Sequence, residues 1–164
     1  MTLLERLFAG RLLSAVLVCV AMASCSSASK GPGGEITKVK YYFLNPLFIL
    51  RTEEPSIRFE REHLLHGAYT AADQISRTGS YYTVMWKADD RTQPVTVRLE
   101  YRQANTALQV KTLEQQVTDV RKRNQTFFKV TGDEYTQGGR VSAWRISLLR
   151  GKEELASQES YLWK

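Results

Sequence analysis

The chain has 164 residues, with 23 lysines and arginines against 17 aspartates and glutamates, which gives a formal net charge of +6. Its two cysteines, Cys19 and Cys25, both lie near the N-terminus, which excludes a disulfide framework or a cysteine-rich zinc site in the rest of the chain. The length suits one ordinary domain, and this domain must be stable through packing alone.

The first residues have the parts of an export signal in order. Arg6 and Arg11 precede a run from Leu12 to Met22 that is apolar except for Ser14, and small residues follow it. A run of this length is too short to span a bilayer, which needs about 20 apolar residues. We therefore expect a signal peptide and not a permanent transmembrane helix.

Two cleavage sites compete at the end of the run. Ala21, Met22 and Ala23 suit ordinary signal peptidase, which would release a plain secreted protein that starts at Ser24. The stretch "MASC" resembles instead the lipobox of bacterial lipoproteins. This resemblance implies a lipoprotein that is cut before Cys25 and carries lipid, such as palmitate, on that cysteine.

We favour the lipoprotein, because it gives the thiol of Cys25 a chemical role and lets the Ser/Gly-rich stretch "SSASKGPGGE" serve as a flexible tether. The outer membrane is favoured in a cell with two membranes, because Ser26 follows the cysteine where an inner-membrane signal would have Asp. The predicted organisation is a signal peptide over 1–24, a lipidated tether over 25–35, and a folded domain over 36–164 that has an N-terminal strand segment, 36–55, and a main sandwich, 56–164.

Strand patterns dominate the folded domain. In chain order we expect strands at "KVKYYFL" and "SIRFERE", separated by a loop that carries Pro46 and Pro55. The next stretch, "YTAADQISRTG", is typical of one helical turn or a loop. In it Thr70 and Asp73 have the spacing of a capping box, and Gly79 marks the stop.

Two alternating patterns follow. The first places Tyr82, Val84 and Trp86 on one face of a strand, and Tyr81, Thr83 and Met85 on the other. The second alternates polar residues with the apolar row Val95, Val97, Leu99 and Tyr101. Because the turn-like stretch "DDRTQP" joins them, the two strands are predicted to form a hairpin.

The remaining chain adds further strands. In "TALQVKTLEQQVTDVRKR" the spacing of Leu113, Val117 and Val120 is helical, but the Val- and Thr-rich composition favours a strand. Strands are also expected at "TFFKVTG", at "RVSAWRISLL", which directs Trp144 and Ile146 to one side, and at "ELASQESYLW". Seven or eight short strands with polar turns predict an all-β fold, an antiparallel β-sandwich.

The pattern from Tyr81 to Trp163 resembles immunoglobulin-like and fibronectin type III-like domains. A tryptophan lies in an early strand, a strand with a tyrosine follows, and Trp144 lies in the penultimate strand. The resemblance implies an immunoglobulin-like sandwich. The inter-sheet disulfide of antibody domains is absent, and sandwiches of this kind serve many functions, so the resemblance implies none.

Candidate chemistry is sparse in this sequence. His63 and His66 are three residues apart, but no third ligand accompanies them, so we interpret them as solvated or turn histidines. The adjacent pairs Glu53–Glu54 and Asp89–Asp90 are interpreted as turn carboxylates, because neighbours in a strand point apart. We therefore expect no enzyme activity, no catalytic residue, no metal and no cofactor.

A basic run, Arg121, Lys122 and Arg123, lies at a predicted turn. The favoured interpretation is a charged hairpin tip, and the alternative is a contact with anionic lipid or an envelope polymer. Export argues against nucleic acid as a partner.

Consecutive aromatic residues are the remaining clue. Tyr41 is followed by Tyr42, Tyr81 by another tyrosine and Phe127 by another phenylalanine, and adjacent residues of a strand face opposite sides. One member of each pair should therefore lie outside the main core. We favour a second layer, made by the N-terminal segment folding over the sandwich; the alternative is an exposed patch for a protein or glycan partner.

Two functions follow as hypotheses. The first is a non-enzymatic envelope lipoprotein, held in the membrane by lipid on Cys25, whose sandwich binds a protein partner or supports an assembly. The second is an enzyme, or an accessory module of one, that acts on envelope or exogenous polysaccharide. A concave site with convergent polar groups would favour the second.

Overall fold

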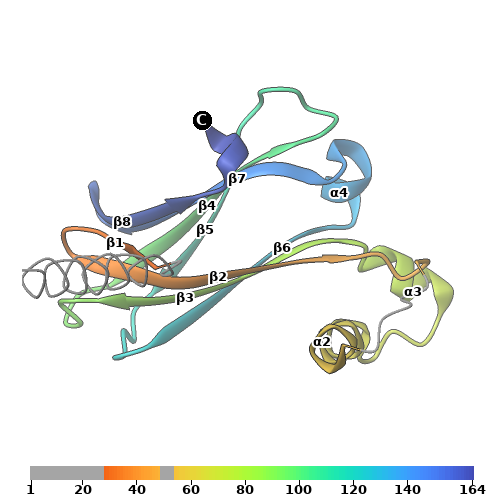
Figure 1. The fold of residues 1–164 in the computed structure, drawn as a ribbon, viewed down its shortest axis with the longest axis horizontal. Helices are drawn as coiled ribbons and strands as arrows, with labels where there is room; N and C mark the ends of the chain where they lie inside the picture. Colours follow the sequence, from red (N-terminus) through yellow and green to blue (C-terminus); the bar gives the residue numbers. More distant parts are fainter. Residues whose placement is uncertain (1–27, 49–53) are drawn as a thin grey trace, which may run out of the picture.

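The computed structural model describes residues 28–48 and 54–164. They form a β-sandwich of two antiparallel four-stranded sheets with a few short helices (Figure 1), which confirms the predicted sandwich. The signal peptide, Cys19, Cys25, Ser26 and Glu53 lie outside the described residues.

The two sheets have different strand orders. Sheet A has the order β1-β2-β3-β6, with β1 at Ser29–Lys30, β2 at Gly34–Leu44, β3 at Gly79–Ala88 and β6 at Asn124–Thr131. Sheet B has the order β5-β4-β7-β8, with β5 at Lys111–Val117, β4 at Val95–Gln103, β7 at Val141–Arg150 and β8 at Glu153–Glu159. These orders confirm the antiparallel sandwich, and the finer prediction of an immunoglobulin-like or fibronectin type III-like topology stays a prediction.

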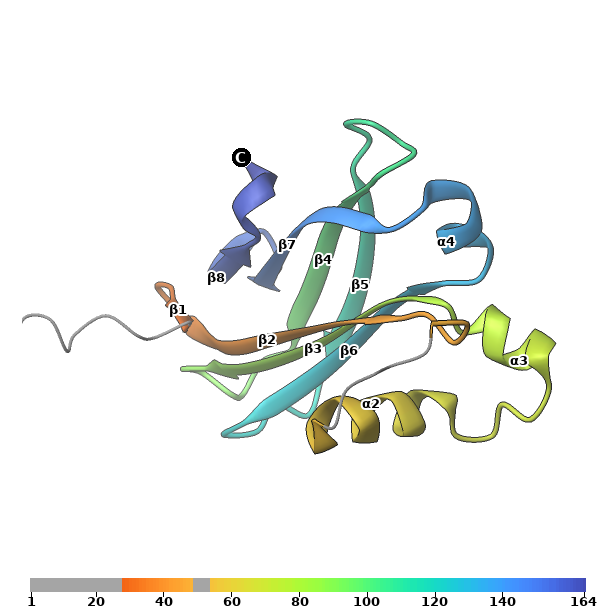
Figure 2. The same cartoon turned by 45° about the vertical axis from the view of Figure 1, so that its right-hand side comes forward.

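Four short helical segments complete the described chain. Helices α2 (Pro55–Leu65) and α3 (Ala71–Ser76) lie between β2 and β3, α4 (Asp133–Gly138) precedes β7, and a 3₁₀ turn (Tyr161–Trp163) ends the chain. Helix α2 runs below sheet A, on the side away from sheet B (Figures 1 and 2).

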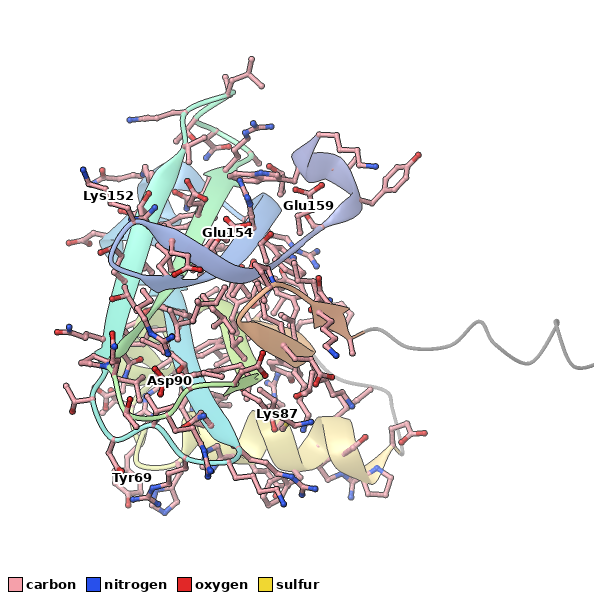
Figure 3. All side chains as sticks on the ribbon, turned by 90° about the vertical axis from the view of Figure 1, so that its left-hand side faces the viewer. Tyr69, Lys87, Asp90, Lys152, Glu154 and Glu159 are labelled. Carbon is pink, nitrogen blue, oxygen red and sulfur yellow. The ribbon has the colours of Figure 1, made fainter. Side chains whose placement is uncertain are left out.

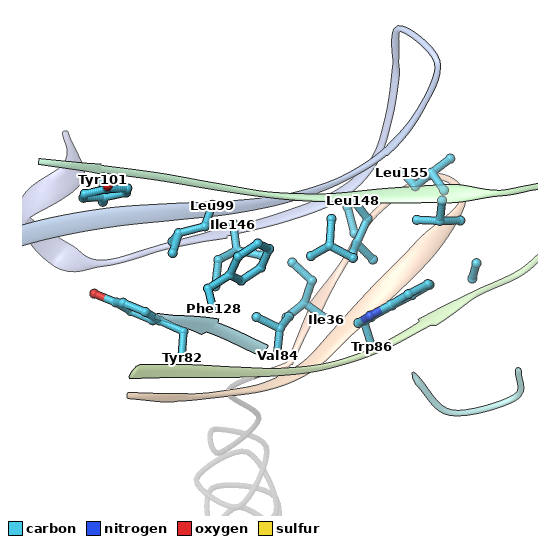
Figure 4. Close-up of a cluster of buried hydrophobic side chains, with 14 of the residues drawn as sticks. Ile36, Tyr82, Val84, Trp86, Leu99, Tyr101, Phe128, Ile146, Leu148 and Leu155 are labelled. Carbon is cyan, nitrogen blue, oxygen red and sulfur yellow. The ribbon is translucent and has the colours of Figure 1, made fainter. Parts of the chain in front are cut away.

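The core lies between the two sheets, as the alternating patterns predict. Val95, Val97, Leu99 and Tyr101 are buried, and so is the facing row of β3 (Figure 4). That row includes Trp86, which is 1% exposed and donates its indole N–H to the Thr126 hydroxyl at 3.0 Å. The polar atom of the largest core side chain is therefore satisfied inside the protein.

The predicted hairpin between β3 and β4 is wrong. β3 pairs with β2 and β6, whereas β4 pairs with β5 and β7, so the chain crosses from one sheet to the other at the turn between them. Each strand is central in its own sheet and buries one side-chain row. The two apolar rows meet face to face across the core, and not side by side.

The predicted strand "SIRFERE" is also wrong, because these residues lie in α2. Pro55 occupies the first turn of this helix, where its fixed φ is favourable and its missing N–H costs nothing. The spacing of Ile57 and Phe59 led to the strand prediction, but in the helix these two residues are 37% and 65% exposed.

The stretch from 69 to 79 follows its predicted capping chemistry. The Asp73 amide donates to the Thr70 hydroxyl at 3.0 Å, and the Thr70 amide donates to the Asp73 carboxylate at 3.2 Å, so the capping box is confirmed. Gly79, however, does not stop the helix. It begins β3 with φ of +151°, and a Cβ there would lie 2.1 Å from the Val130 carbonyl oxygen.

The stretch with competing patterns, 106–123, contains β5, as the strand prediction requires. Leu113 and Val117 pack against the core from this strand. Sheet A begins inside the range 25–35 that was predicted as a tether. Ser29 pairs with Ile36, and Lys30 pairs with Glu35. A turn at residues 31–33 connects the two strands. Glycine and proline suit tight turns as well as flexible tethers, so composition alone does not separate the two.

Candidate functional site

The outer face of sheet A, the face turned away from sheet B, is the most distinctive surface of the described chain. The strand register arranges its side chains in rows across three strands. The rows are Tyr42–Tyr81–Lys129, Lys40–Thr83–Phe127 and Lys38–Met85–Gln125.

Helix α2 covers one end of this face and leaves a cavity of about 280 Å³ against β3 and β6, which we call the α2 groove. Leu64, Tyr81 and Phe127 give it an apolar lining, and Glu60, His63 and Lys129 add polar groups. Phe127 is 62% exposed, so the apolar lining continues to the protein surface.

Arginine hydrogen bonds hold α2 in place. Arg61 donates from Nη1 to the Asn45 carbonyl at 3.0 Å and from Nη2 to the Pro46 carbonyl at 2.7 Å. Arg77 donates to the carbonyl oxygens of Leu64 and His66 at 2.8 and 2.7 Å. No residue of the helix is fully buried, although Leu64 and Leu65 are half-buried, so polar contacts with the flanking loops and partial apolar burial together position it.

Aromatic groups extend the groove toward solvent. The rings of Phe59 and His63 stack with centroids 6.1 Å apart and planes 9° apart, and Phe59 is 65% exposed. Tyr81 donates its hydroxyl to the Arg77 carbonyl at 2.7 Å, and burial raises the pKa of this tyrosine. Burial also raises the pKa of Tyr42, so both phenols stay protonated and neutral at physiological pH.

The predicted aromatic residues divide between the two faces of sheet A. Tyr42, Tyr81 and Phe127 lie on the outer face, and the prediction that one member of each pair leaves the core is confirmed by Phe127 and Phe128, which are 62% and 7% exposed. Tyr41 lies on the inner face at the edge of the sheet, with its ring centroid 5.2 Å from that of Tyr82. The N-terminal segment does not form the predicted second layer, because it supplies β2 of sheet A; the layer over this face is α2, which follows that segment.

The predicted basic run lies at the other end of sheet A, in the turn before β6. Arg121, Lys122 and Arg123 are exposed, and Arg121 forms an ion pair with Asp119 at 2.7 Å. Arg123 borders an open hollow of about 450 Å³ that also contacts Lys87 and Met85. This run is therefore not part of the α2 groove.

The remaining candidates have local roles. His63 lies in the last turn of α2, and His66 follows its end. Asp90 accepts hydrogen bonds from the Thr92 amide at 2.8 Å and hydroxyl at 2.7 Å, as the turn interpretation requires. Residues 28–48 and 54–164 contain no group of three metal-ligating side chains close enough to share an ion.

Sequence reasoning missed the helical half of the groove. The sequence predicts a strand at Phe59 and a solvated or turn position for His63, and nothing in it places these residues or Leu64 against Tyr81 and Phe127. Pro55 was the available signal, because a proline before an Arg- and Glu-rich stretch is typical of the first turn of a helix.

The chain matches no family model, no curated protein and no solved structure at a significant level. In the part of the chain that the structure describes, no helix has the length and apolar character needed to cross a membrane.

Proposed function

We propose that this protein is a non-enzymatic envelope lipoprotein, anchored through lipid on Cys25 and favoured to lie in the outer membrane, whose sandwich binds a protein partner. The observation that carries the proposal is the α2 groove, a cavity lined by exposed Phe127 and by His63, whose ring stacks on exposed Phe59. Large exposed aromatic side chains around an apolar hollow are typical of protein-binding surfaces.

The attachment of α2 supports this role. Since hydrogen bonds from Arg61 and Arg77 help to hold the helix and none of its residues is fully buried, it can shift at a small cost in buried apolar surface. An apolar side chain of the partner would fill the cavity between Leu64 and Phe127, and the polar rim at Glu60 and Lys129 would contact the partner's backbone.

Site-specific photocrosslinking in intact membranes tests the binding role. A photoreactive phenylalanine analogue at position 127 should give a discrete crosslinked species, whereas the same analogue at Tyr161, which is 90% exposed in the C-terminal 3₁₀ turn, should not. Phe59→Asp should weaken the crosslink at position 127, because it places a charge at the mouth of the groove. Equal crosslinking at both positions, or none at 127, would contradict the proposal.

The anchor is tested separately. Cys25→Ser removes the only atom that can form the lipid thioether, so the variant should remain an uncleaved precursor or enter the soluble envelope fraction, while Cys19→Ser should change nothing. Membrane fractionation and mass measurement of the mature N-terminus check this. An unmodified chain that starts at Ser24 would show plain secretion instead.

A further inference from the structure

Among the described strands, the sandwich covers part of its strand edges and leaves others open, and the edge of β2 is one of the open ones. On β8, the Leu155 carbonyl accepts from the Gly33 amide at 3.2 Å, and the Ser157 carbonyl accepts from the Ser29 hydroxyl. On β7, Trp144 exchanges hydrogen bonds with Ser160 through its amide, at 2.9 Å, and its carbonyl, at 2.8 Å. These contacts occupy backbone groups that another chain could otherwise pair with.

The edge of β2 is different. β1 pairs with β2 only at Glu35 and Ile36, and from Lys38 to Leu44 the strand pairs with β3 alone among the described strands. The N–H and C=O groups of successive residues point to alternate sides of a strand. Gly34, in the core-facing row, directs its carbonyl to the β1 side, where it accepts from the Gly31 amide. A β-bulge interrupts β2 between Ile36 and Lys38. After it, the core-facing residues Val39, Tyr41 and Phe43 continue the same row and present their backbone groups to the open side.

Apolar surface accompanies this open edge. Tyr41 is 37% exposed, and Val39 and Phe43 in the same row are only partly buried. Trp144 of β7 is also partly buried, and its ring lies 6.0 Å from that of Tyr82, which Tyr41 contacts at 5.2 Å. β6 also lies at an edge of sheet A, but its core-facing residues Thr126, Phe128 and Val130 are between 1% and 7% exposed. A strand added to β2 would therefore bury apolar side chains of the core-facing row, whereas a strand added to β6 would not.

Positive charge flanks the same edge on both faces. Lys38 and Lys40 are exposed on the outer face, and Arg140 lies on the inner face with its guanidinium carbon 4.6 Å from the centroid of the Phe43 ring and its Nε donating to the Tyr41 hydroxyl at 3.0 Å. Within the described chain none of the three forms an ion pair. Edge lysines repel a second copy of β2, which carries the same charges, and attract an acidic strand.

We propose that the edge of β2 from Lys38 to Leu44 is a docking site for an extended acidic segment of another protein, which adds to sheet A as a strand in line with β1. Its apolar side chains cover Tyr41, Phe43 and Trp144, and its carboxylates, at alternate positions, face Lys38 and Lys40. Free N–H and C=O groups in register favour a peptide over an anionic membrane, because lipid headgroups cannot continue a strand ladder. This site is separate from the α2 groove and does not depend on the function proposed for it.

The test uses the full chain in detergent and a fluorescein-labelled synthetic peptide of nine residues that alternates Glu and Val. Fluorescence anisotropy should detect binding that weakens as salt is added, and hydrogen exchange should slow at residues 38–44. A Lys/Val peptide should bind at least about tenfold more weakly. A Glu/Val peptide that is N-methylated at two adjacent central residues should also bind at least about tenfold more weakly. Adjacent N–H groups point to opposite edges of the peptide strand, so this peptide lacks a central donor on either edge.

Matched protein variants locate the site. Lys38→Glu with Lys40→Glu should reverse the preference, so that the Lys/Val peptide binds better than the Glu/Val peptide. Lys122→Glu with Lys152→Glu makes the same change in net charge at the β5–β6 turn and at the β7–β8 turn (Figure 3), and should preserve the preference. Phe127→Asp, in the α2 groove, should leave peptide binding unchanged.

Three results would overturn the proposal: no binding of the Glu/Val peptide at millimolar concentration, equal binding of the N-methylated peptide, or equal effects of the two double variants. Binding to phosphatidylglycerol vesicles without binding to the peptide would also overturn it and assign the lysines to a membrane contact. Circular dichroism of each variant separates these results from loss of folding.

Discussion

The two faces of sheet A hold their neighbours in different ways. The inner face meets sheet B through buried side chains such as Trp86, Leu99 and Ile146, which are at most 1% exposed. The outer face is covered by α2, whose side chains are at most half-buried and which guanidinium hydrogen bonds of Arg61 and Arg77 tie to the loops beside the sheet. One contact depends on apolar burial and fixes the fold; the other depends on polar groups that also bond to water, and leaves a cavity.

Trp86 gives the largest expected effect on the inner face. Trp86→Ala removes the largest core side chain and also leaves the Thr126 hydroxyl without its donor, so the free energy of unfolding should fall by about 4 to 5 kcal/mol. Urea unfolding followed by circular dichroism measures the loss. Trp144→Ala, at a partly buried position, should cost less, and an equal cost would show that the core extends to the sheet edge.

The pair Phe127 and Phe128 compares the two faces within one strand. Phe128→Ala should cost about 3 kcal/mol, because the ring is 7% exposed in the core, whereas Phe127→Ala should cost less than about 0.5 kcal/mol. With the photoreactive analogue moved to position 59, only the second variant should weaken partner crosslinking in membranes. If both variants destabilise the fold equally, α2 packs on Phe127 as firmly as sheet B packs on Phe128.

Arg61 tests the polar attachment of α2. Arg61→Ala removes the donors to Asn45 and Pro46, so hydrogen exchange should quicken across Pro55–Leu65, with a loss of global stability of about 1 kcal/mol or less. Arg58→Ala, on the exposed surface of the same helix, is the control and should not change the exchange. Unchanged exchange in Arg61→Ala would show that apolar contacts hold the helix.

The smallest effect at neutral pH is expected for Tyr82→Phe. The Tyr82 hydroxyl is buried without a hydrogen-bond partner in the described chain, so its removal should leave stability at pH 7 unchanged within about 0.5 kcal/mol. Burial raises the pKa of Tyr82 far above its ordinary value of 10.0. The unfolded chain then releases this proton near pH 10 while the folded chain keeps it, so stability falls as the pH rises above 10.

Tyr82→Phe should therefore reduce the loss of folding stability that occurs as the pH rises above 10. Tyr101→Phe should reduce this loss too, because burial, and then the Glu134 carboxylate, raise the pKa of Tyr101. This second variant loses a hydrogen bond of 3.1 Å to Glu134, so it should be less stable at pH 7. Thermal unfolding between pH 7 and 11 measures both, and an unchanged loss of stability at alkaline pH in Tyr82→Phe would show that its phenol ionises freely.

The sequence was sufficient where one strand's own pattern decides its structure. Val95, Val97, Leu99 and Tyr101 alternate with polar residues, and this alone predicted a strand with one buried face. The capping box of Thr70 and Asp73 is equally local, since the two residues satisfy each other's amides. The prediction from side-chain spacing failed at Ile57 and Phe59, because two apolar residues at a spacing of two are compatible with an exposed helix as well as with a strand.

The candidate surfaces were less predictable than the strands. Adjacent aromatics indicated that Phe127 or Phe128 leaves the core, because strand geometry forces them apart. Nothing local indicated that α2 would come to lie over Tyr81 and Phe127, since the arginine contacts that hold it join residues up to 16 positions apart.

By itself, then, the sequence determined side-chain alternation, turn chemistry and the sandwich class, because each depends on neighbouring residues whose geometry is fixed by the backbone. Only the tertiary structure decided that β3 and β4 belong to different sheets, that α2 covers one end of the outer face, and that β2 keeps an open edge at Lys38–Leu44. Those outcomes depend on strand pairing between distant residues. An alternating pattern shows which face of a strand is buried, but it does not show which strand lies beside it.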